Sequence, residues 1–490
     1  MIAVATGHAK TSQAAFDVLE AGGTAIDACI AAALMAFVAE PVLAGPLGGG
    51  FLLHVPRDGQ ARMLDAFVQT PMRARSDQDI RAIEADFGTS TQTFHIGAGT
   101  VAASGLMPAL FDAHAARGRI PMTELAAPAV KAARDGLTLT PFQARLNSIV
   151  APILTASTGI SALYAEDGKL RPAGTQMHNA ALADVLEVSA IEGHRIFVDG
   201  EVGQALCQMD GSHLTLNDLR RYTAQYRTPL NVQRGDAEIL LNPAPSIGGT
   251  QIALALMLCP HRANPVERAA CLAAIHELRS QGEIDTSSAV LGELRRTLSR
   301  GGIRQTGTTH ISVIDQKGDG AALTLSNGTG AGLLVPGTGI MPNNMLGEED
   351  VVPGGIEGWQ PNTRLTSAMC PTALRRADGG VSLLGSGGSN RIRSALTHVA
   401  LNLLDHGMRL EQAIEAPRLH VDGIPSHLDA EAPLPEGELV ALRNAWPEML
   451  HWKEPSMYFG GVHAVRRDRT GRQVEAAADP RREGTALSRS

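Results

Sequence analysis

The most informative part of the chain is the run GTTHISVID at residues 307–315. From Thr309 to Asp315 the run alternates as a strand with one buried face does. Thr308 directly follows Gly307. Cleavage of the peptide bond between them would give Thr308 a free α-amine beside its own hydroxyl. Such an amine activates a hydroxyl as a nucleophile.

The same two residues supply a route to that cleavage. Gly307 has no side chain to shield its carbonyl and tolerates unusual backbone dihedrals. Attack by the Thr308 hydroxyl would convert the peptide to an ester, which water then opens. The freed amine has a pKa of roughly 7.7–8.0, which suits a general base. Taken alone, a strand that starts after a glycine turn is the plainer interpretation.

Composition limits the class of protein. The chain has 490 residues, 44% of them apolar and 19% charged, as expected for a soluble globular protein with a large core. The formal net charge of -8 and the lack of a long basic stripe argue against a nucleic-acid partner.

Cysteine and histidine spacing gives no sign of a metal, a disulfide framework or an organic cofactor. The five cysteines include no CxxC pair, and no histidines show HxxxH or HExxH spacing. The apolar run 28–39 is too short to span a bilayer, and no secretory signal pattern opens the sequence. We therefore expect a cytoplasmic protein with no membrane partner and no cofactor.

Hydrophobic periodicity predicts helices layered over antiparallel sheets. Helices are expected at 10–20, 25–39, 122–133, 179–186, 251–258 and 392–405. Hairpins are expected within 51–66, 309–326, 372–384 and 462–478. The polar segment 281–307 is expected to be an exposed connector, and residues 481–490 a frayed end.

Several polar groups are candidates for a site around Thr308. Ser326 and Asn327 end the strand expected to pair with 309–315, so they would orient the Thr308 hydroxyl or hold substrate; solvent-facing strand ends are the alternative. Glu348 opens an acidic triplet that would bind an ammonium group or form a solvated loop. Ser367 would bind a carboxylate or cap a turn.

The glycine-rich run 385–390 follows a predicted strand and precedes a predicted helix. Its backbone amides would stabilise a tetrahedral oxyanion, and a phosphate nest is a second possibility. A plain tight turn is the simplest interpretation.

Taken together, these segments resemble the γ-glutamyltransferase (glutathione hydrolase) family of N-terminal-nucleophile hydrolases over nearly the whole chain. No single motif carries the resemblance, but their order and spacing are specific. The matching segments are 21–28, 40–41, 48–51, 243–249, 308–313, 336–344, 416–420 and 479–482.

The resemblance implies an α+β fold, a four-layer αββα sandwich made as one precursor. Self-cleavage would give a large subunit, 1–307, and a small subunit, 308–490, interleaved in one globular unit that could form a homo-oligomer. Thr308 would attack a small-molecule γ-glutamyl amide and form an acyl-enzyme, which water or an acceptor amine releases.

The family's other site residues map onto this chain by resemblance alone. Gly387 and Gly388 match the oxyanion site, with the glycines shifted by one. Ser367 matches the first of two serines that hold the substrate carboxylate, and the second is Ala368 here. Glu348 falls near the acidic ligand for the substrate amine.

One departure concerns the substrate pocket. The family has an arginine that clamps the α-carboxylate of the glutamyl group, and Phe67 occupies that place here. Removing one partner of such a buried pair costs about 2–5 kcal/mol. Either another cation, Arg391 or Arg73, replaces the clamp, or the substrate carries an apolar group there.

Three hypotheses follow. The first is a self-processing enzyme that acts on γ-glutamyl or related acyl amides. The second keeps the chemistry but takes another small amide, such as an oxamate-like, β-lactam acyl or poly-glutamyl compound. The third is an unprocessed relative that binds a metabolite without catalysis.

Overall fold

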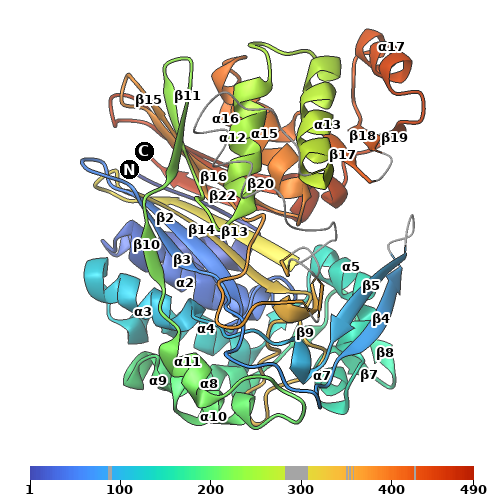
Figure 1. Ribbon diagram of the computed structural model, residues 1–490. Helices are drawn as coiled ribbons and strands as arrows, with labels where there is room; N and C mark the ends of the chain where they lie inside the picture. The colour runs from blue at the N-terminus through green and yellow to red at the C-terminus, as the bar shows by residue number, and fades with distance from the viewer. Residues whose placement is uncertain (87–90, 282–306, 349–350, 353–354, 357, 424–425) are drawn as a thin grey trace.

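Two antiparallel sheets lie face to face with helices on both outer faces (Figure 1). The structure is a computed structural model that describes residues 1–86, 91–281, 307–348, 351–352, 355–356, 358–423 and 426–490. The arrangement confirms the predicted αββα sandwich. The predicted connector at 281–307 lies almost entirely outside the described residues.

The first sheet places the segment around Thr308 at its centre. Each neighbouring pair of its strands is antiparallel. In spatial order its strands are β10 (Gln225–Arg227), β3 (Arg62–Ala66), β2 (Gly49–Val55), β14 (Gly320–Gly328), β13 (Gly307–Ile314), β1 (Ile2–Thr6) and β22 (Thr485–Arg489). The predicted hairpins of β2 with β3 and of β13 with β14 are confirmed.

The second sheet packs against the first through apolar side chains that both sheets share. It contains the other two predicted hairpins, β15 with β16 and β20 with β21. Its order is β11 (Leu230–Arg234), β12 (Ala237–Leu241), β15 (Thr372–Arg376), β16 (Val381–Gly387), β20 (Gly461–Arg467) and β21 (Val474–Ala478).

Helix α2 (Ala25–Ala39) shows why the helices cover the sheets. Nearly all of its residues are apolar and buried, because it lies between the first sheet and the outer helices. Thr24 and Asp27 cap its first turn reciprocally, and Pro41 follows its end. The predicted bounds of α2 are confirmed, and those of α1 (Ala9–Glu20) are confirmed to within one residue.

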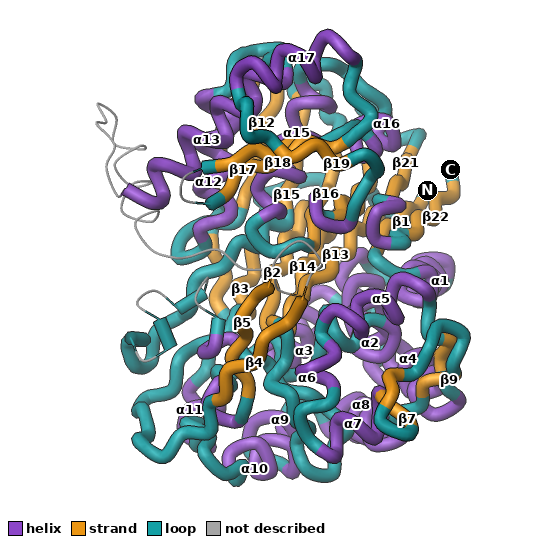
Figure 2. Tube along the Cα trace, turned by 90° about the vertical axis from the view of Figure 1, so that its right-hand side faces the viewer, coloured by secondary structure: helices purple, strands orange, loops and turns teal. Residues whose placement is uncertain are grey.

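The remaining helices form the two outer layers (Figures 1 and 2). Below the first sheet lie α3 (Leu106–Arg117), α4 (Met122–Asp135), α5 (Pro141–Ile149), α6 (Ala151–Leu154), α7 (Thr158–Tyr164), α8 (Ala180–Glu192), α9 (Arg195–Val198), α10 (Glu201–Cys207) and α11 (Leu216–Arg221). Around the second sheet lie α12 (Ile247–Leu258), α13 (Pro265–Gln281), α15 (Arg391–Leu404), α16 (Leu410–Glu415) and α17 (Glu436–Ala445).

Several short strands lie outside the two main sheets. They are β4 (Arg81–Asp86) with β5 (Thr91–Ile96), β6 (Leu137–Thr138) with β9 (Gln176–Met177), β7 (Ala165–Glu166) with β8 (Lys169–Leu170), and the small sheet of β17 (Leu419–Asp422), β18 (His427–Glu431) and β19 (Leu450–Trp452). Among the described residues, no helix combines the length and apolar character needed to cross a bilayer.

Three sequence predictions about the fold are wrong, the first being the end of helix α8, which continues to Glu192, six residues beyond the predicted end. The end of the chain is not frayed, because β22 pairs along the whole of β1 and brings the two termini side by side (Figure 2). Helix α12 begins at Ile247, four residues earlier than predicted. The backbone N–H groups of Ile247 and Gly248 donate to the carbonyl of Ser367, so a contact from a distant segment fixes its first turn.

Candidate active site

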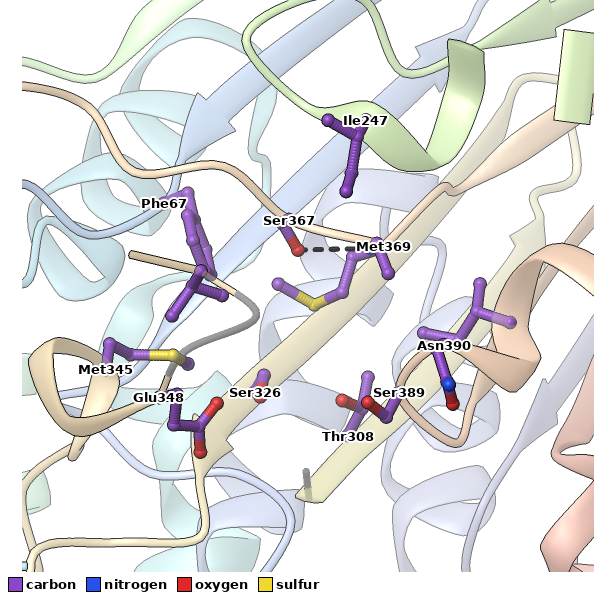
Figure 3. Close-up of a pocket in the computed structure, with 13 residues that line it drawn as sticks. Phe67, Ile247, Thr308, Ser326, Met345, Glu348, Ser367, Met369, Ser389 and Asn390 are labelled. Atoms are coloured by element: carbon purple, nitrogen blue, oxygen red, sulfur yellow. Dashed lines mark hydrogen bonds between the residues drawn. The ribbon is translucent and has the colours of Figure 1, made fainter. Parts of the chain in front are cut away.

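Thr308 lies at the start of β13, at the bottom of a pocket between the two sheets (Figure 3). Its side chain is 2% exposed, and a register shift separates it from Gly307. The pocket opens to solvent, and its empty space together with its open mouth amounts to about 470 Å³. The residues that line it are Phe67, Ile247, Thr308, Ser326, Met345, Glu348, Val351, Ser367, Ala368, Met369, Ser389, Asn390 and Ile392.

Ser326 lies directly opposite Thr308 on β14. Its hydroxyl donates to the carbonyl oxygen of Gly307 at 2.5 Å and accepts from the N–H of Gly328 at 3.1 Å. The carbonyl that the Thr308 hydroxyl would attack is therefore held by a short hydrogen bond that draws electron density toward its oxygen.

Asn327 does not line the pocket, although it was predicted to contact substrate. It is completely buried, its side-chain amide donates to the carbonyl of Met341 at 3.0 Å, and its own N–H donates to Leu43 at 3.3 Å. Alternation along β14 points it away from Ser326. Its contacts tie β14 to the neighbouring loops.

Glu348 lines the pocket and is 5% exposed. One carboxylate oxygen accepts from the N–H of Thr329 at 3.0 Å. Asn344 accepts from the same N–H at 2.9 Å, so the loop that carries Glu348 is fixed against the end of β14. The rest of the predicted acidic triplet, 349–350, lies outside the described residues.

Phe67 forms an apolar wall of the pocket. Its ring stacks on Phe51 with centroids 5.5 Å apart, and Met345 and Met369 line the same space (Figure 3). A Cβ added to Gly49 would lie 2.7 Å from the Phe67 ring, so glycine is required there for close approach. This wall places aromatic and thioether groups where a carboxylate clamp was expected.

Neither predicted replacement for that clamp lines the pocket. The guanidinium of Arg391 lies over the Tyr458 ring, 4.1 Å from its centroid, and donates to Asn390 at 2.7 Å. Arg73 is exposed at the surface. Within the part of the chain that the structure describes, no arginine or lysine lines this pocket.

Ser367 lines the pocket, as predicted, and is rigidly held. Its hydroxyl accepts from the N–H of Met369 at 3.0 Å, the dashed line in Figure 3. Its carbonyl accepts from the Ser246 hydroxyl at 2.7 Å. The proline–serine–glycine segment at 243–249 thus positions one wall of the pocket, which its sequence alone did not indicate.

The glycine-rich loop passes directly over the backbone of Thr308. A Cβ added to Gly387 would lie 2.1 Å from the Thr308 carbonyl oxygen, and Gly388 has a φ of +124°. Both positions therefore require glycine. Ser389 and Asn390, rather than the two glycines, line the pocket; their place directly after the glycine pair was the missed signal.

A buried carboxylate supports the residue next to Thr308. Glu40 accepts from the hydroxyls of Thr309 at 2.6 Å and Thr11 at 2.8 Å. Burial raises the pKa of Glu40 to about 6, against the opposing effect of these two hydrogen bonds. From the sequence, Glu40 stands out only as part of a family motif, because its hydrogen-bond partners are distant in the sequence.

His310, two residues after Thr308, is not part of the pocket. Its ring lies between the hydroxyls of Thr324 and Ser312, each 2.8 Å away, and burial lowers its pKa well below the ordinary value. Among the described residues, no group of histidine, cysteine, aspartate and glutamate side chains is arranged to hold a metal ion.

Two stacked antiparallel sheets between helical layers are the fold of the N-terminal-nucleophile hydrolases. The solved structure of a cephalosporin acylase from Bacillus halodurans has the same fold, with a TM-score of 0.84 at 22% identity over 100% of this chain and 96% of that one.

Sequence comparison then gives the family. The model described as Gamma-glutamyltranspeptidase matches residues 11–278 and 268–488, so the chain belongs to the gamma-glutamyltranspeptidase family. The glutathione hydrolase proenzyme of Pseudomonas aeruginosa is 27% identical, over 99% of this chain and 94% of that protein. The Acylase ACY 1 proenzyme of Pseudomonas sp. (strain SE83) is 27% identical, over 90% and 85%.

Proposed function

We propose that this protein is a self-processing amide hydrolase or acyltransferase whose nucleophile is Thr308. Cleavage before Thr308 would divide it into chains 1–307 and 308–490. The observation that carries the proposal is the Thr308 pocket itself. It joins a buried threonine at the Gly307 junction to a carbonyl already hydrogen-bonded by Ser326.

Processing would begin with attack of the Thr308 hydroxyl oxygen on the Gly307 carbonyl carbon. The C–N bond then breaks, the nitrogen takes up a proton, and an ester links Gly307 to Thr308. Water hydrolyses the ester to a Gly307 carboxylate and a free Thr308. Ser326 supports the first step, because its hydrogen bond strengthens as negative charge develops on the Gly307 oxygen.

Turnover would then use the new α-amine as general base. The amine takes the hydroxyl proton as the oxygen attacks the substrate amide, and the proton passes to the departing amine. Water or an acceptor amine next releases the acyl group. The loop 387–390 lies against Thr308 and is our candidate for the donors that stabilise the tetrahedral oxyanion.

The walls of the pocket favour an acyl group other than γ-glutamyl. Phe67, Met345 and Met369 offer apolar contact, while Glu348 is suited to an ammonium group or another hydrogen-bond donor. Among the residues that the structure describes, no cation lines the pocket to clamp a γ-glutamyl α-carboxylate, which is a loss of about 2–5 kcal/mol or very roughly 30- to 5000-fold. We therefore favour an amide with an uncharged end at Phe67. The relative named an acylase supports a wider range of acyl groups than γ-glutamyl.

The first test is mass spectrometry of the purified protein with N-terminal sequencing. We expect two chains, one of which begins at Thr308. Thr308→Ala should remain in one piece and be inactive, whereas Thr363→Ala, at an exposed position, should behave as wild type. An intact, active wild-type chain would refute the mechanism. An intact, inactive chain that folds normally would favour the non-catalytic alternative.

The second test is a substrate panel on processed protein. The γ-glutamyl, glutaryl, phenylacetyl and leucyl p-nitroanilides differ in the charge that they would place at Phe67. We expect the highest kcat/KM from a compound without a carboxylate at that end. If γ-glutamyl-p-nitroanilide is the best substrate, the proposed substrate class is wrong although the nucleophile stands.

A further inference from the structure

Arg482 is a buried cation without a carboxylate partner among the described residues. It is 8% exposed, and its Nη2 donates only to the carbonyl of Met457, at 3.3 Å. Its Nε has no hydrogen-bond partner within the ranges that the structure describes. Burial lowers the pKa of Arg482 to about 10, so the guanidinium is still charged at neutral pH.

The nearby acidic groups are engaged by other arginines. Asp479 pairs with Arg418 at 2.5 Å and with Arg481 at 3.2 Å, and Glu431 pairs with Arg481 at 2.7 Å. Within the described part of the chain, no carboxylate oxygen lies within 4.0 Å of Arg482. A buried charge that lacks such a partner lowers stability, so this arrangement calls for an explanation other than folding.

The guanidinium lies beside the glycine-rich loop. A Cβ added to Gly387 would be 3.3 Å from its Nη1, and one added to Gly388 would be 3.1 Å from its Nη2. The stem of Arg482 packs across Gly461, which is paired with Gly387 in the second sheet. The same added Cβ on Gly387 would also lie 2.1 Å from the carbonyl oxygen of Thr308, so the guanidinium and that carbonyl lie on the same side of Gly387.

We propose that Arg482 is a positioning residue that fixes the loop 387–388 and places a positive charge beside it, where it stabilises the oxyanion formed when Thr308 attacks an amide. This inference rests on the proposed function. Arg482 forms no bond to substrate and transfers no proton. In a water-poor site, a fixed charge interacts more strongly with a developing oxyanion than it would in water.

The test compares Arg482→Met, which keeps the stem but removes the charge, with Arg482→Lys, which keeps a charge. Both are processed and assayed with the best p-nitroanilide of the panel. We expect Arg482→Met to lower kcat about 10- to 100-fold with KM within about twofold, because oxyanion charge develops only in the transition state. Its Tm should be equal to or above that of wild type. Arg482→Lys should recover most of kcat.

Arg467→Met is the matched control. Arg467 is 6% exposed, its Nε also has no partner, and it lies at the other end of β20 from Gly461. We expect this variant to keep the wild-type kcat with an unchanged or higher Tm. If Arg467→Met lowers kcat as much as Arg482→Met does, removal of any buried arginine has the effect and the inference is wrong.

The outcomes separate the inference from the function beneath it. The proposed function is refuted if wild-type protein yields no chain that begins at Thr308, or if it shows no amide turnover. An active wild type together with a fully active Arg482→Met refutes only the role of Arg482. A fall in both kcat and Tm that is the same in Arg482→Met and Arg482→Lys also refutes only the role of Arg482. If Arg482→Met is not processed, Arg482→Gln takes its place, with the same expected kcat loss and the same recovery by lysine.

Discussion

Phe67 is the residue at which this pocket departs most from what the family resemblance predicted. We expect Phe67→Arg to raise kcat/KM for γ-glutamyl-p-nitroanilide at least about 10-fold, since a cation would then face the α-carboxylate. Turnover of apolar acyl amides should fall. Steady-state kinetics of the two substrates measure both effects. Phe67→Leu is the control, and it should give no gain with the glutamyl compound; an equal gain would show that space rather than charge matters.

Ser326 offers a test of the processing step alone. Its hydroxyl donates to the Gly307 carbonyl oxygen at 2.5 Å. Ser326→Ala therefore removes the hydrogen-bond donor to the carbonyl of the peptide bond that would be cleaved. We expect self-cleavage to slow by about 100- to 1000-fold, the range found for the loss of an oxyanion donor. A time course of freshly translated protein on a denaturing gel measures the rate. Cleavage at the wild-type rate would remove Ser326 from the mechanism.

Glu40 predicts a pH dependence of stability. Burial raises its pKa in the folded protein from 4.5 to about 6, so the neutral acid is the form that the fold favours. This contribution is fully present below pH 4.5 and is lost as the pH rises through 6. The shift corresponds to about 2 kcal/mol.

Glu40→Gln mimics the neutral acid and should abolish that loss. Both proteins carry Thr308→Ala so that they stay uncut. As the pH rises from 4.5 to 7.5, the free energy of unfolding of Glu40→Gln should increase by up to about 2 kcal/mol relative to that of its parent. Urea titrations at both pH values give the difference. A constant difference between the two proteins would mean that Glu40 titrates normally.

At the scale of the element, local patterns in the sequence were sufficient for helices α1 and α2 and for the four hairpins. The capping residues before α2, its continuous apolar run and Pro41 after it are all encoded within a few positions. The hairpin of β13 and β14 follows from two alternating runs around a short turn. The same hairpin placed Ser326 beside Thr308 correctly.

Features that depend on distant partners were not predictable from the sequence. Strand β22 exists because β1, at the opposite end of the chain, presents an edge to pair with. Asn327 turned away because the alternation of β14 allows only one of two neighbours to face the pocket. No local pattern could show that Arg482 lies beside Gly387 and Gly388, or that Arg391 stacks on Tyr458 instead of entering the pocket.

The cap of α2 gives a prediction at this scale. The Thr24 hydroxyl accepts from the N–H of Asp27 at 3.1 Å, and the Asp27 carboxylate accepts from the N–H of Thr24 at 2.9 Å. Thr24→Ala should therefore lower the free energy of unfolding by about 1 kcal/mol. Urea denaturation of the Thr308→Ala precursor measures it. Thr24→Ser should retain most of the stability, and an equal loss would point to the methyl group instead of the cap.

Across the whole molecule, the proposed cut falls between strands that the two resulting chains share. In the first sheet β1 belongs to residues 1–307, yet it lies between β13 and β22 of residues 308–490. We therefore expect the two chains to elute together in gel filtration and to separate only in denaturant. Separation in native buffer would contradict this interleaving. Uncut Thr308→Ala, which should elute at the same volume, is the control.

The central position of β13 has a practical consequence. Thr308, its second residue, reaches the geometry seen here only when a strand from the start of the chain and one from further along both flank β13. If scission is self-catalysed, it should follow assembly of the sheet rather than precede it. The intact band on a denaturing gel would then give the fraction of molecules that never assembled. Each preparation could be checked for correct folding on the same gel.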